Sequence, residues 1–449
     1  MSRFEQDIIV APATLSGGAI ALIRMSGEGS IALADRFFEG RKKLADCKGH
    51  TIHYGNFVEA GGEVVDDVMV SIFRAPNSYT SEESVEISCH GSAYIVQKII
   101  EKLISGGARM ANAGEFTVRA FMAGRLDLSQ AEGVAATIGS TDRATHRLAA
   151  TQMRGGYSEK LEKLRTELVR LGSLLELELD FSEEDVEFAD RGELEDLMRR
   201  LKGEVEQLCN SFQLGNAIKN GVSVAIVGAP NAGKSTLLNQ LLGEDRAMVS
   251  AVAGTTRDSI EEMMTIDGVT FRFIDTAGLH ETSDELERMG IERSYKAIER
   301  AQIIIHLIDV ADYKSGNFEA IECSSEQQLI RVVNKIDLDS EGVSDSDVLA
   351  ISAQSGAGVD LLRASLISTI DLSALYSGDV IVSNARHYQH LVAASESLDR
   401  AIESLRSGVS GDLLSDDLRH TLHEIGSITG LITNDEILAT IFSTFCIGK

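Results

Sequence analysis

The stretch "GAPNAGKST", Gly228 to Thr236, decides the fold of the segment around it. It follows the apolar run "VSVAIV" at 222–227 and precedes a helical pattern. Glycines there let successive backbone N–H groups point at one anion, and the start of the helix adds partial positive charge. A G-x-x-x-x-G-K-[ST] pattern in this place predicts a phosphate-binding loop, with Lys234 at the outer phosphates and Ser235 on Mg²⁺.

Three further motifs identify the nucleotide. "DTAG" at 275–278 ends a strand pattern, where a carboxylate can hold the magnesium shell and a glycine N–H can meet the γ-phosphate. "NKID" at 334–337 follows another strand pattern. The Asp337 carboxylate can accept hydrogen bonds from guanine N1–H and from the exocyclic amine of guanine, a pair of donors that adenine lacks. "SAQ" at 352–354 is the expected neighbour of the base. The sequence therefore predicts a GTPase.

A polar segment, "SAVAGTTRD" at 250–258, lies between the phosphate loop and the magnesium aspartate, and its Thr256 hydroxyl can complete the metal shell. The predicted nucleotide contacts are Asn231, Ala232, Gly233, Lys234, Ser235, Thr236, Ser250, Ala251, Val252, Ala253, Gly254, Thr255, Thr256, Asp275, Thr276, Ala277, Gly278, Asn334, Lys335, Asp337, Ser352, Ala353 and Gln354. Ras-like GTPases orient the attacking water with a glutamine directly after D-x-x-G, where this chain has Leu279. A leucine cannot orient water, so we look to the acids of "HETSDELER" at 280–288.

Composition and charge limit the class of protein. With 449 residues the chain is long enough for several domains, and 43% hydrophobic and 25% charged residues are typical of globular proteins. No signal peptide or bilayer-spanning run is evident, and five scattered cysteines fit a reducing compartment, so we expect a cytoplasmic protein with no membrane partner. A net charge of −27 opposes nonspecific binding to nucleic acid. An RNA partner would need a local basic patch, and 143–170 is such a segment, or a second protein.

Periodicity predicts a multidomain α/β plus all-α chain. Short apolar runs alternate with glycine turns in the N-terminal part, which indicates an α+β domain. Leu161, Leu164, Leu168, Leu171 and Leu175 then form one stripe on a long helix, which predicts bundle core. Continuous apolar runs after 222 predict a doubly wound sheet, and helical patterns return after it. The helical flanks should pack together as one discontinuous domain around the inserted Ras-like P-loop domain. The predicted domains are 1–120, 121–218, 219–373 and 374–449.

The order of the motifs, with "GTTRD" before "DTAGL", resembles the GTPase domain of the MnmE/TrmE tRNA-modification family. The likeness extends to "YTSEESVEISCHGS" (79–92), "GEFTVRAFMAGRLDLSQAEGV" (114–134) and the terminal "CIGK", so it runs the length of the chain. It implies a homodimer formed through a tetrahydrofolate-binding N-terminal domain. It also implies a flavin-dependent partner, MnmG (GidA), in a heterotetramer or larger complex. Together they add a carboxymethylaminomethyl or aminomethyl group to C5 of the wobble uridine of certain tRNAs. The implied one-carbon donor is 5-formyl- or methylene-tetrahydrofolate.

The resemblance also implies roles for single residues. Potassium, which stimulates GTP hydrolysis in the family, would be held by Asn231, Ser250, Val252 and Thr255, and Mg²⁺ by Ser235 and Thr256. Glu287 would orient the attacking water. Folate contacts would fall on Arg24, Glu82, Arg125 and Lys449. Two departures matter: His280 stands where the family often has arginine, and Arg125 where it often has lysine.

The terminal "FCIGK" has the outline of a prenylation box, but Gly448 is not aliphatic, Lys449 is not a usual last residue, and prenyl processing would remove Lys449. A spare thiol remains open, because nothing in the local sequence predicts a lowered pKa. The sharper hypothesis is that a mobile terminal segment delivers Cys446 to the folate or uridine site as a catalytic group.

Other readings stay open. A GTP-dependent switch or assembly factor without a part in modification would show the same motifs, and so would a folate-dependent methyltransferase with a regulatory GTPase insert. The pairs His387/His390 and His420/His423 could share a metal, but without a third ligand at fixed spacing we expect them on helix surfaces. Cys89 and His90 are neighbours on a predicted strand and should point to opposite faces, which argues against a nucleophile pair.

Overall fold

The structure is a computed structural model, and it divides the chain into two compact units. Residues Met1–Ala135 with Gly426–Lys449 form one unit, and Ala136–Ile425 form the other. The structure describes residues 7–15, 17–59, 61–180, 191–243, 262–274, 297–324, 327–339, 342–343, 345–370, 373–407, 411–432, 435–443, 445 and 448. Among the described helices, none combines the length and apolar character that a bilayer crossing requires.

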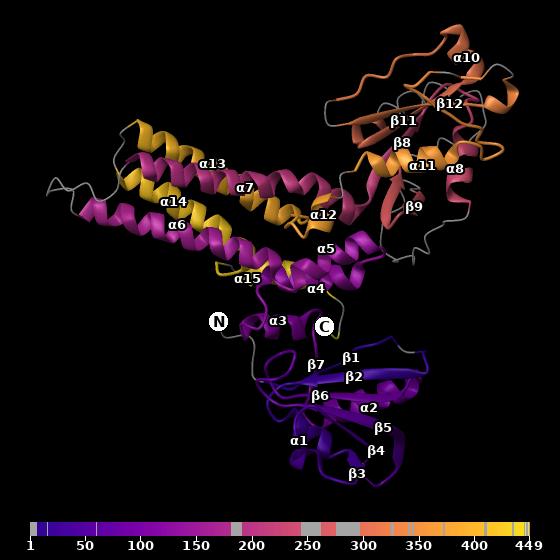
Figure 1. Ribbon diagram of the computed structural model, residues 1–449. Coiled ribbons are helices and arrows are strands. Elements are labelled where there is room, and N and C mark those ends of the chain that lie inside the picture. Colours follow the sequence, from indigo (N-terminus) through magenta and orange to yellow (C-terminus); the bar gives the residue numbers. More distant parts are fainter. Residues whose placement is uncertain are drawn as a thin grey trace. The chain divides into compact units, whose positions relative to one another are not determined.

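A six-stranded sheet forms the nucleotide-binding part of the second unit (Figure 1). Its strands are β8 (Val222–Val227), β9 (Glu262–Ile266), β10 (Val269–Phe273), β11 (Ile303–Asp309), β12 (Gln328–Asn334) and β13 (Leu349–Ala350), in the order β13-β12-β11-β8-β10-β9. Only β9 and β10 pair antiparallel among them. The strands β8 and β11 are buried over nearly their whole length, as the continuous apolar runs predict for a covered parallel sheet.

Short helices connect these strands. They are α8 (Lys234–Leu242), α10 (Val310–Ser315), the 3₁₀ turn η4 (Ile336–Leu338), α11 (Val359–Ser368) and α12 (Ser373–Ser377). Leucines of α8 and α11 enter the same core as Val224, Phe271 and Leu307 of the sheet. This packing holds the carboxyl ends of β8 and β12 in place, and both ends carry predicted nucleotide residues.

Long helices make up the rest of the second unit. They are α4 (Leu128–Gly139), which begins in the first unit, α5 (Arg143–Met153), α6 (Gly156–Asp180), α7 (Arg191–Asn220), α13 (Ala385–Arg406) and α14 (Gly411–Thr429), which ends in the first unit. The leucine stripe at 161–175 is buried along α6, which confirms the prediction of bundle core. In Figure 1, α7 and α13 lie side by side, and the rings of Phe212 and Tyr388 stack with centroids 4.3 Å apart.

Helix α7 leads into β8 and α13 follows the last helix of the sheet domain, so segments on either side of the insertion pack together as predicted. Gly215 of α7 allows a close approach of the segment before α13, because a Cβ at Gly215 would lie 2.0 Å from Val382 O. Helix α5 starts at the β9–β10 turn, where Ala144 N donates to Gly268 O at 3.1 Å. Asp142 Oδ2 also accepts a hydrogen bond from Thr270 Oγ1 at 2.7 Å.

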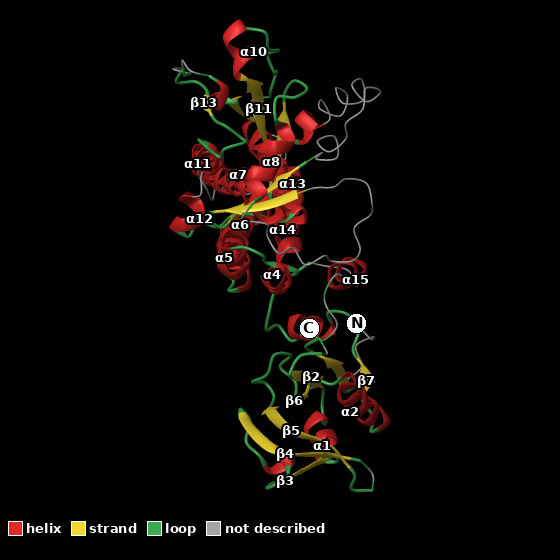
Figure 2. Cartoon of the chain, turned by 90° about the vertical axis from the view of Figure 1, so that its right-hand side faces the viewer, coloured by secondary structure: helices red, strands yellow, loops and turns green. Residues whose placement is uncertain are grey.

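The first unit contains a seven-stranded sheet (Figure 2). Its strands are β1 (Ile9–Pro12), β2 (Ile20–Ser26), β3 (Phe38–Gly40), β4 (Thr51–Val58), β5 (Val64–Phe73), β6 (Ser84–His90) and β7 (Arg109–Met110), in the order β3-β4-β5-β6-β2-β1-β7. The pairs are antiparallel apart from β1 with β7. The other elements are α1 (Ser30–Asp35), η1 (Leu44–Asp46), α2 (Ala93–Ser105), α3 (Glu115–Met122) and α15 (Asp435–Ser443).

The two faces of this sheet differ. Alternate residues such as Ile23, Val70 and Ile87 share one core with α1 and α2. On the opposite face Ile52 and Tyr54 of β4 are 66% and 67% exposed, so among the described residues this face is open at β4, whereas Phe116 packs against Ile9 and Ala11 of β1. Cys89 is buried and His90 is exposed and bonded to Asp66, which confirms that the two side chains point apart.

The end of the chain packs within the first unit. Phe442 and Phe445 are buried in a cluster with Val118 and Leu128. Gly448 has φ 97°, and a Cβ there would lie 2.3 Å from Pro12 O of β1. Gly448 is therefore packed against the end of β1 at a position where only glycine fits.

Candidate functional site

The phosphate loop connects β8 to α8 in the geometry that its glycines predict. Gly228 and Gly233 have φ of 158° and 99°, and a Cβ at Gly228 would lie 2.1 Å from Leu307 O. Lys234 Nζ donates to Gly228 O at 2.8 Å and to Ala229 O at 3.0 Å. These bonds hold the ammonium group inside the loop, and burial lowers the pKa of Lys234. Ser235 and Thr236 occupy the first turn of α8.

Asn334 joins the phosphate loop to the predicted base-binding segments. Its side chain is 2% exposed, Nδ2 donates to Ala232 O at 2.8 Å, and Oδ1 accepts from Ala353 N at 2.9 Å. A Cβ at Gly233 would lie 2.4 Å from this Nδ2, which is why the loop requires glycine there. One buried amide therefore brings three of the predicted motifs together.

Lys335 and Asp337 follow Asn334 in the next turn. Lys335 has φ 66°, and its ammonium group pairs with Asp309 Oδ2 at 2.7 Å. Burial alone would raise the pKa of Asp309, but hydrogen bonds from Lys335 and from Ala311 N lower it below its usual value. The Asp337 carboxylate is exposed and can reach a ligand. The predicted contacts did not include Asp309, although an acid directly after the apolar run 303–308 was a usable signal.

The segment after β13 forms a closed turn beside Asn334. Ser352 N donates to Ala357 O at 2.9 Å, and Ser352 Oγ accepts from Ser355 N at 3.2 Å. Ile336 N donates to Ile351 O at 3.3 Å, which ties this turn to the one that carries Asp337. Ser352 and Ala353 are buried and Gln354 is exposed. The turn therefore supports the Asp337 side of the site.

Several predicted residues lie outside the described part of the chain. They are Ser250, Ala251, Val252, Ala253, Gly254, Thr255, Thr256, Asp275, Thr276, Ala277, Gly278, His280, Glu287, Cys446 and Lys449. Their roles in binding K⁺, Mg²⁺, water and folate therefore remain predictions.

A second polar site lies on the first unit, around Arg24 of β2. Its guanidinium pairs with Glu86 Oε1 at 2.8 Å across the neighbouring strand. It also lies over two aromatic rings, 5.6 Å from the centroid of Tyr79 and 5.8 Å from that of Phe116. Arg24 Nη1 donates to Gly448 O at 3.4 Å. The C-terminal segment thus reaches one of the predicted folate contacts.

The other two described folate candidates lie near Tyr79. Burial raises the pKa of the Tyr79 hydroxyl, which shares a hydrogen bond with Thr117 Oγ1 at 3.0 Å, and the charges of Arg24 and Arg125 oppose that rise. Arg125 is exposed just beyond α3. Glu82 accepts hydrogen bonds from Ser26 Oγ at 2.8 Å and from Arg119 Nη1 at 3.2 Å. These bonds fix the Glu82 carboxylate, which stays partly exposed.

Beneath Glu82, buried charges form a network that was not predicted. Arg119 is 6% exposed, and its Nη2 donates to Asp7 Oδ1 at 2.7 Å and to Glu115 Oε1 at 3.2 Å. Arg109 also pairs with Glu115, at 2.7 Å. Burial would raise the pKa of Glu115, but the hydrogen bonds from Arg109 and from Asn112 N lower it. A charged residue within the apolar run "FTVRAF" was the signal in the sequence.

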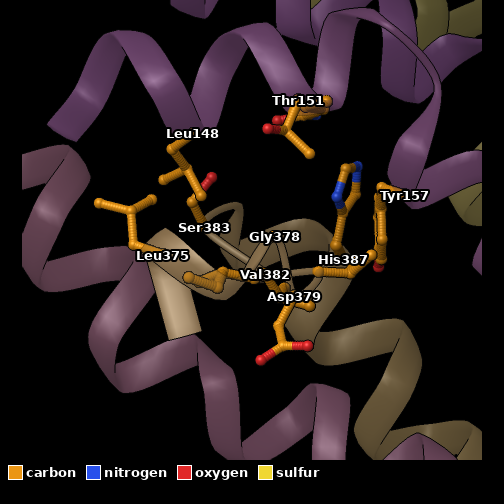
Figure 3. Close-up of a pocket in the computed structure, with 12 residues that line it drawn as sticks. Leu148, Thr151, Tyr157, Leu375, Gly378, Asp379, Val382, Ser383 and His387 are labelled. Carbon is orange, nitrogen blue, oxygen red and sulfur yellow. The ribbon is translucent and has the colours of Figure 1, made fainter. Parts of the chain in front are cut away.

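The prediction that the paired histidines lie on helix surfaces is wrong for His387. It is 1% exposed, and its ring stacks on Tyr157 with centroids 5.2 Å apart (Figure 3). The cavity beside these rings holds about 20 Å³, room for roughly one water molecule and too little for a ligand. His390 Nδ1 pairs with Glu424 at 2.7 Å. No group of three metal-ligating side chains occurs among the described residues.

Comparison with known proteins bears on the whole chain. Residues 8–125 match a family model described as GTP-binding protein TrmE N-terminus, and residues 128–446 match one described as MnmE helical domain. The tRNA modification GTPase MnmE of Flavobacterium johnsoniae is 47% identical, over 99% of this chain and 100% of that protein. The protein of the same name from Bacteroides fragilis is also 47% identical, with the same coverage.

A part of the chain is also similar to a solved structure, that of Era in complex with MgGDPNP and nucleotides of 16S ribosomal RNA. The match has 25% identity, covers 39% of this chain and 66% of that chain, and has a TM-score of 0.24. The family models and the full-length relatives, by contrast, extend over both units and agree with the phosphate loop and the guanine motif described above. The chain belongs to the MnmE family of tRNA modification GTPases.

Proposed function

We propose that this GTPase works with a flavoprotein of the MnmG (GidA) type to add a carboxymethylaminomethyl or aminomethyl group to C5 of the wobble uridine of certain tRNAs. The observation that carries the proposal is that one chain holds a phosphate loop fixed by Asn334 and a second site at Arg24, which the C-terminal segment reaches. Such a chain can couple GTP turnover to chemistry on another ligand. A tRNA substrate agrees with the cytoplasmic location expected from the sequence.

At the nucleotide site, the donor set fits a hard cation. The Ser235 hydroxyl in the first turn of α8 and the predicted Thr256 hydroxyl are oxygen ligands of the kind that Mg²⁺ prefers. Asn231 has φ 63° and an exposed side chain at the rim of the loop, so its carboxamide oxygen is available to K⁺, with Ser250, Val252 and Thr255 as further predicted ligands. A monovalent cation at that place supplies the positive charge that an arginine finger gives in other GTPases. Glu287 is the proposed residue that orients water.

At the second site, the chemistry fits a tetrahydrofolate. Bound there, the folate would supply the one-carbon unit. Arg24 and Arg125 offer cations to its glutamate carboxylates, and the Tyr79 and Phe116 rings offer apolar surface to its flat ring system. The fixed Glu82 carboxylate can accept hydrogen bonds from ring N–H groups. In the sequence Cys446 comes two residues before Gly448, the residue that contacts Arg24, and Lys449 directly follows it, so we propose that Lys449 holds the ligand and Cys446 acts on it.

The proposed partners are a second copy of the chain and the flavoprotein, in a heterotetramer or larger complex. The exposed apolar side chains Ile52, Tyr54 and Met69 on β4 and β5 of the seven-stranded sheet support a homodimer through the N-terminal domain. Contiguous exposed apolar side chains of this kind are typical of protein interfaces. Nucleotide-driven dimerisation of the GTPase domains would then control the modification reaction.

Mass spectrometry of wobble nucleosides tests this function. We expect tRNA from a deletion strain to lack the C5 group and tRNA from the complemented strain to regain it. Unchanged tRNA in the deletion strain would leave the alternative of a GTP-dependent switch or assembly factor. Modification that persists after deletion of the flavoprotein would favour a folate-dependent methyltransferase instead.

A further inference from the structure

The turn after β12, residues 335–339, carries the predicted guanine contact and is joined to helix α10 by an ion pair. Strands β11 and β12 are parallel, with Asp309 opposite Asn334 in the register, so the residues that follow the two strands lie side by side. The Lys335 ammonium pairs with Asp309 Oδ2 at 2.7 Å. The other oxygen, Asp309 Oδ1, accepts from Ala311 N at 3.0 Å and caps α10. One carboxylate therefore holds both the helix and the lysine of the turn.

A second ion pair joins α10 to the other end of this turn. Lys314 Nζ donates to Asp339 Oδ1 at 2.6 Å. Its polarity is the reverse of the first pair, because here the helix supplies the cation and the turn supplies the acid. Asp337 lies between the two paired residues of the turn, and its carboxylate is exposed. The turn is thus held on both sides of the residue that is predicted to read the base.

The charges around Asp337 decide whether its carboxylate stays free. Residues 309–315 and 335–339 contain two cations and four acids, which are Lys314, Lys335, Asp309, Asp312, Asp337 and Asp339. The charged groups that act on Tyr313 of α10 are Arg331, Asp345 and Asp347. Lysine side chains are long and flexible, and Lys335 is two residues from Asp337. An ammonium group paired with Asp337 would compete with guanine, whereas Asp309 and Asp339 engage the two lysines instead.

We propose that Asp309 is a positioning residue for guanine recognition, which acts through Lys335 and leaves the Asp337 carboxylate free to accept hydrogen bonds from the base. Lys335 has φ 66°, a conformation that is uncommon for a residue with a side chain, so other contacts must hold it. The ion pair is such a contact. The side chains of Lys335 and Asp309 are 32% and 22% exposed, so water screens the pair less than at an open surface.

The test is a double-mutant cycle in the full-length chain, measured as the affinity and dissociation rate of a fluorescent GDP analogue. Asp309→Asn removes the charge, and asparagine can still cap α10. Lys335→Met removes the ammonium group and keeps an unbranched side chain. We expect Asp309→Asn alone to weaken binding by about threefold to tenfold, mainly through faster dissociation. In the Lys335→Met background the same change should alter affinity by less than about twofold, because the residue through which Asp309 acts is gone.

Three comparisons separate positioning from a general loss of structure. Asp312→Asn removes the same charge from the same helix and should bind GDP within about twofold of wild type. Asp309→Glu restores the charge and should bind more tightly than Asp309→Asn. In steady state, Asp309→Asn should raise KM for GTP about threefold to tenfold and change kcat by less than about twofold, because the pair lies at the base and not at the γ-phosphate. The cycle uses the first ion pair because Lys314 and Asp339 have further interactions as well.

Two results would overturn the inference. One is wild-type affinity in Asp309→Asn. The other is an equal loss of affinity in both backgrounds, which would make Asp309 a structural acid of α10 that does not act through Lys335. If Lys335→Met binds too weakly for the cycle, Asp309→Glu decides, and an affinity as low as that of Asp309→Asn would then count against the ion pair. The inference rests on the predicted contact of Asp337 with guanine, and competition between GTP and XTP in Asp337→Asn tests that contact separately. The wobble-nucleoside assay remains the test of the proposed function.

Discussion

Asn334 Nδ2 donates a hydrogen bond to Ala232 O at 2.8 Å across 102 residues of sequence, and this single contact connects the guanine motif to the phosphate loop. The amide oxygen of the same side chain accepts from Ala353 N. Both groups are buried, so neither can be replaced by water without a structural change. The two ends of the nucleotide site are therefore positioned by one side chain.

Replacement of Asn334 by alanine should loosen the whole nucleotide site. Ala232 O and Ala353 N would lose their partners, which costs about 1–3 kcal/mol for buried groups. We expect a lower midpoint in thermal unfolding followed by circular dichroism, and weaker binding of a fluorescent GTP analogue. The exposed Asn239→Ala on α8 is the control, with a change within about 0.5 kcal/mol. Wild-type affinity and stability in Asn334→Ala would contradict the role assigned to the contact.

Asp337→Asn should change the base that the site accepts. The carboxylate accepts from two guanine donors, whereas an asparagine amide would face the guanine amine with its own N–H groups. Xanthine carries an oxygen in place of that amine, so the variant should prefer XTP over GTP, by about tenfold or more for a pair of hydrogen bonds. Competition binding of GTP and XTP measures this. Asp360→Asn, on an exposed turn of α11, should keep the preference for GTP. Unaltered preference in Asp337→Asn would remove this residue from the base site.

Glu115→Gln should alter the pH dependence of stability in the first unit. The pKa of Glu115 is lowered below its usual 4.5, so the carboxylate stabilises the fold above that pH and the contribution is lost as the pH falls through the lowered value. The variant should be less protected from hydrogen exchange near pH 7 over residues 109–122, and its protection should decline less as the pH falls from about 5 through the lowered pKa of Glu115. Glu28→Gln, an exposed acid, is the control. If protection from hydrogen exchange declined equally with pH in wild type and in Glu115→Gln, the stabilising role of the Glu115 carboxylate would be contradicted.

Arg24→Ala should weaken folate binding and leave GTP turnover unchanged. Loss of a charge-assisted hydrogen bond costs about 1.5–3 kcal/mol, which corresponds to roughly tenfold to a hundredfold in affinity. Titration calorimetry with 5-formyltetrahydrofolate measures the effect. Arg36→Ala is the matched control, because Arg36 also lies over an aromatic ring, 5.7 Å from the centroid of Phe37. Equal affinities in the two variants would place the folate elsewhere.

Potassium should raise GTP turnover through Asn231. We expect the wild-type rate to fall severalfold when K⁺ is replaced by Na⁺, and the difference to disappear in Asn231→Ala. Because Asn231 has φ 63°, alanine there also strains the backbone, so Asn231→Gly separates the side chain from the strain. Loss of the K⁺ effect in both variants identifies the carboxamide as the ligand. Equal wild-type rates in K⁺ and Na⁺ would exclude this cation site.

The sequence by itself determined the class of each segment and the order of the nucleotide motifs. Short sequence patterns are enough to predict local features, because these depend on backbone preferences and on periodic burial. The strand runs, the leucine stripe of α6 and the glycines of the phosphate loop are examples. The opposite orientations of Cys89 and His90 follow for the same reason, since neighbours on a strand alternate between faces.

Only the tertiary structure decided which distant side chains meet. The bridge from Asn334 to Ala232, the pairing of Arg119 with Asp7, and the approach of Gly448 to Arg24 join residues that no local pattern relates. The burial of His387 could not be predicted for the same reason. Helical spacing indicates on which face of the helix a side chain lies, but not that Tyr157 packs on that face. The physical reason is that burial of a polar group depends on its partners, and those partners are brought near by the packing of whole elements.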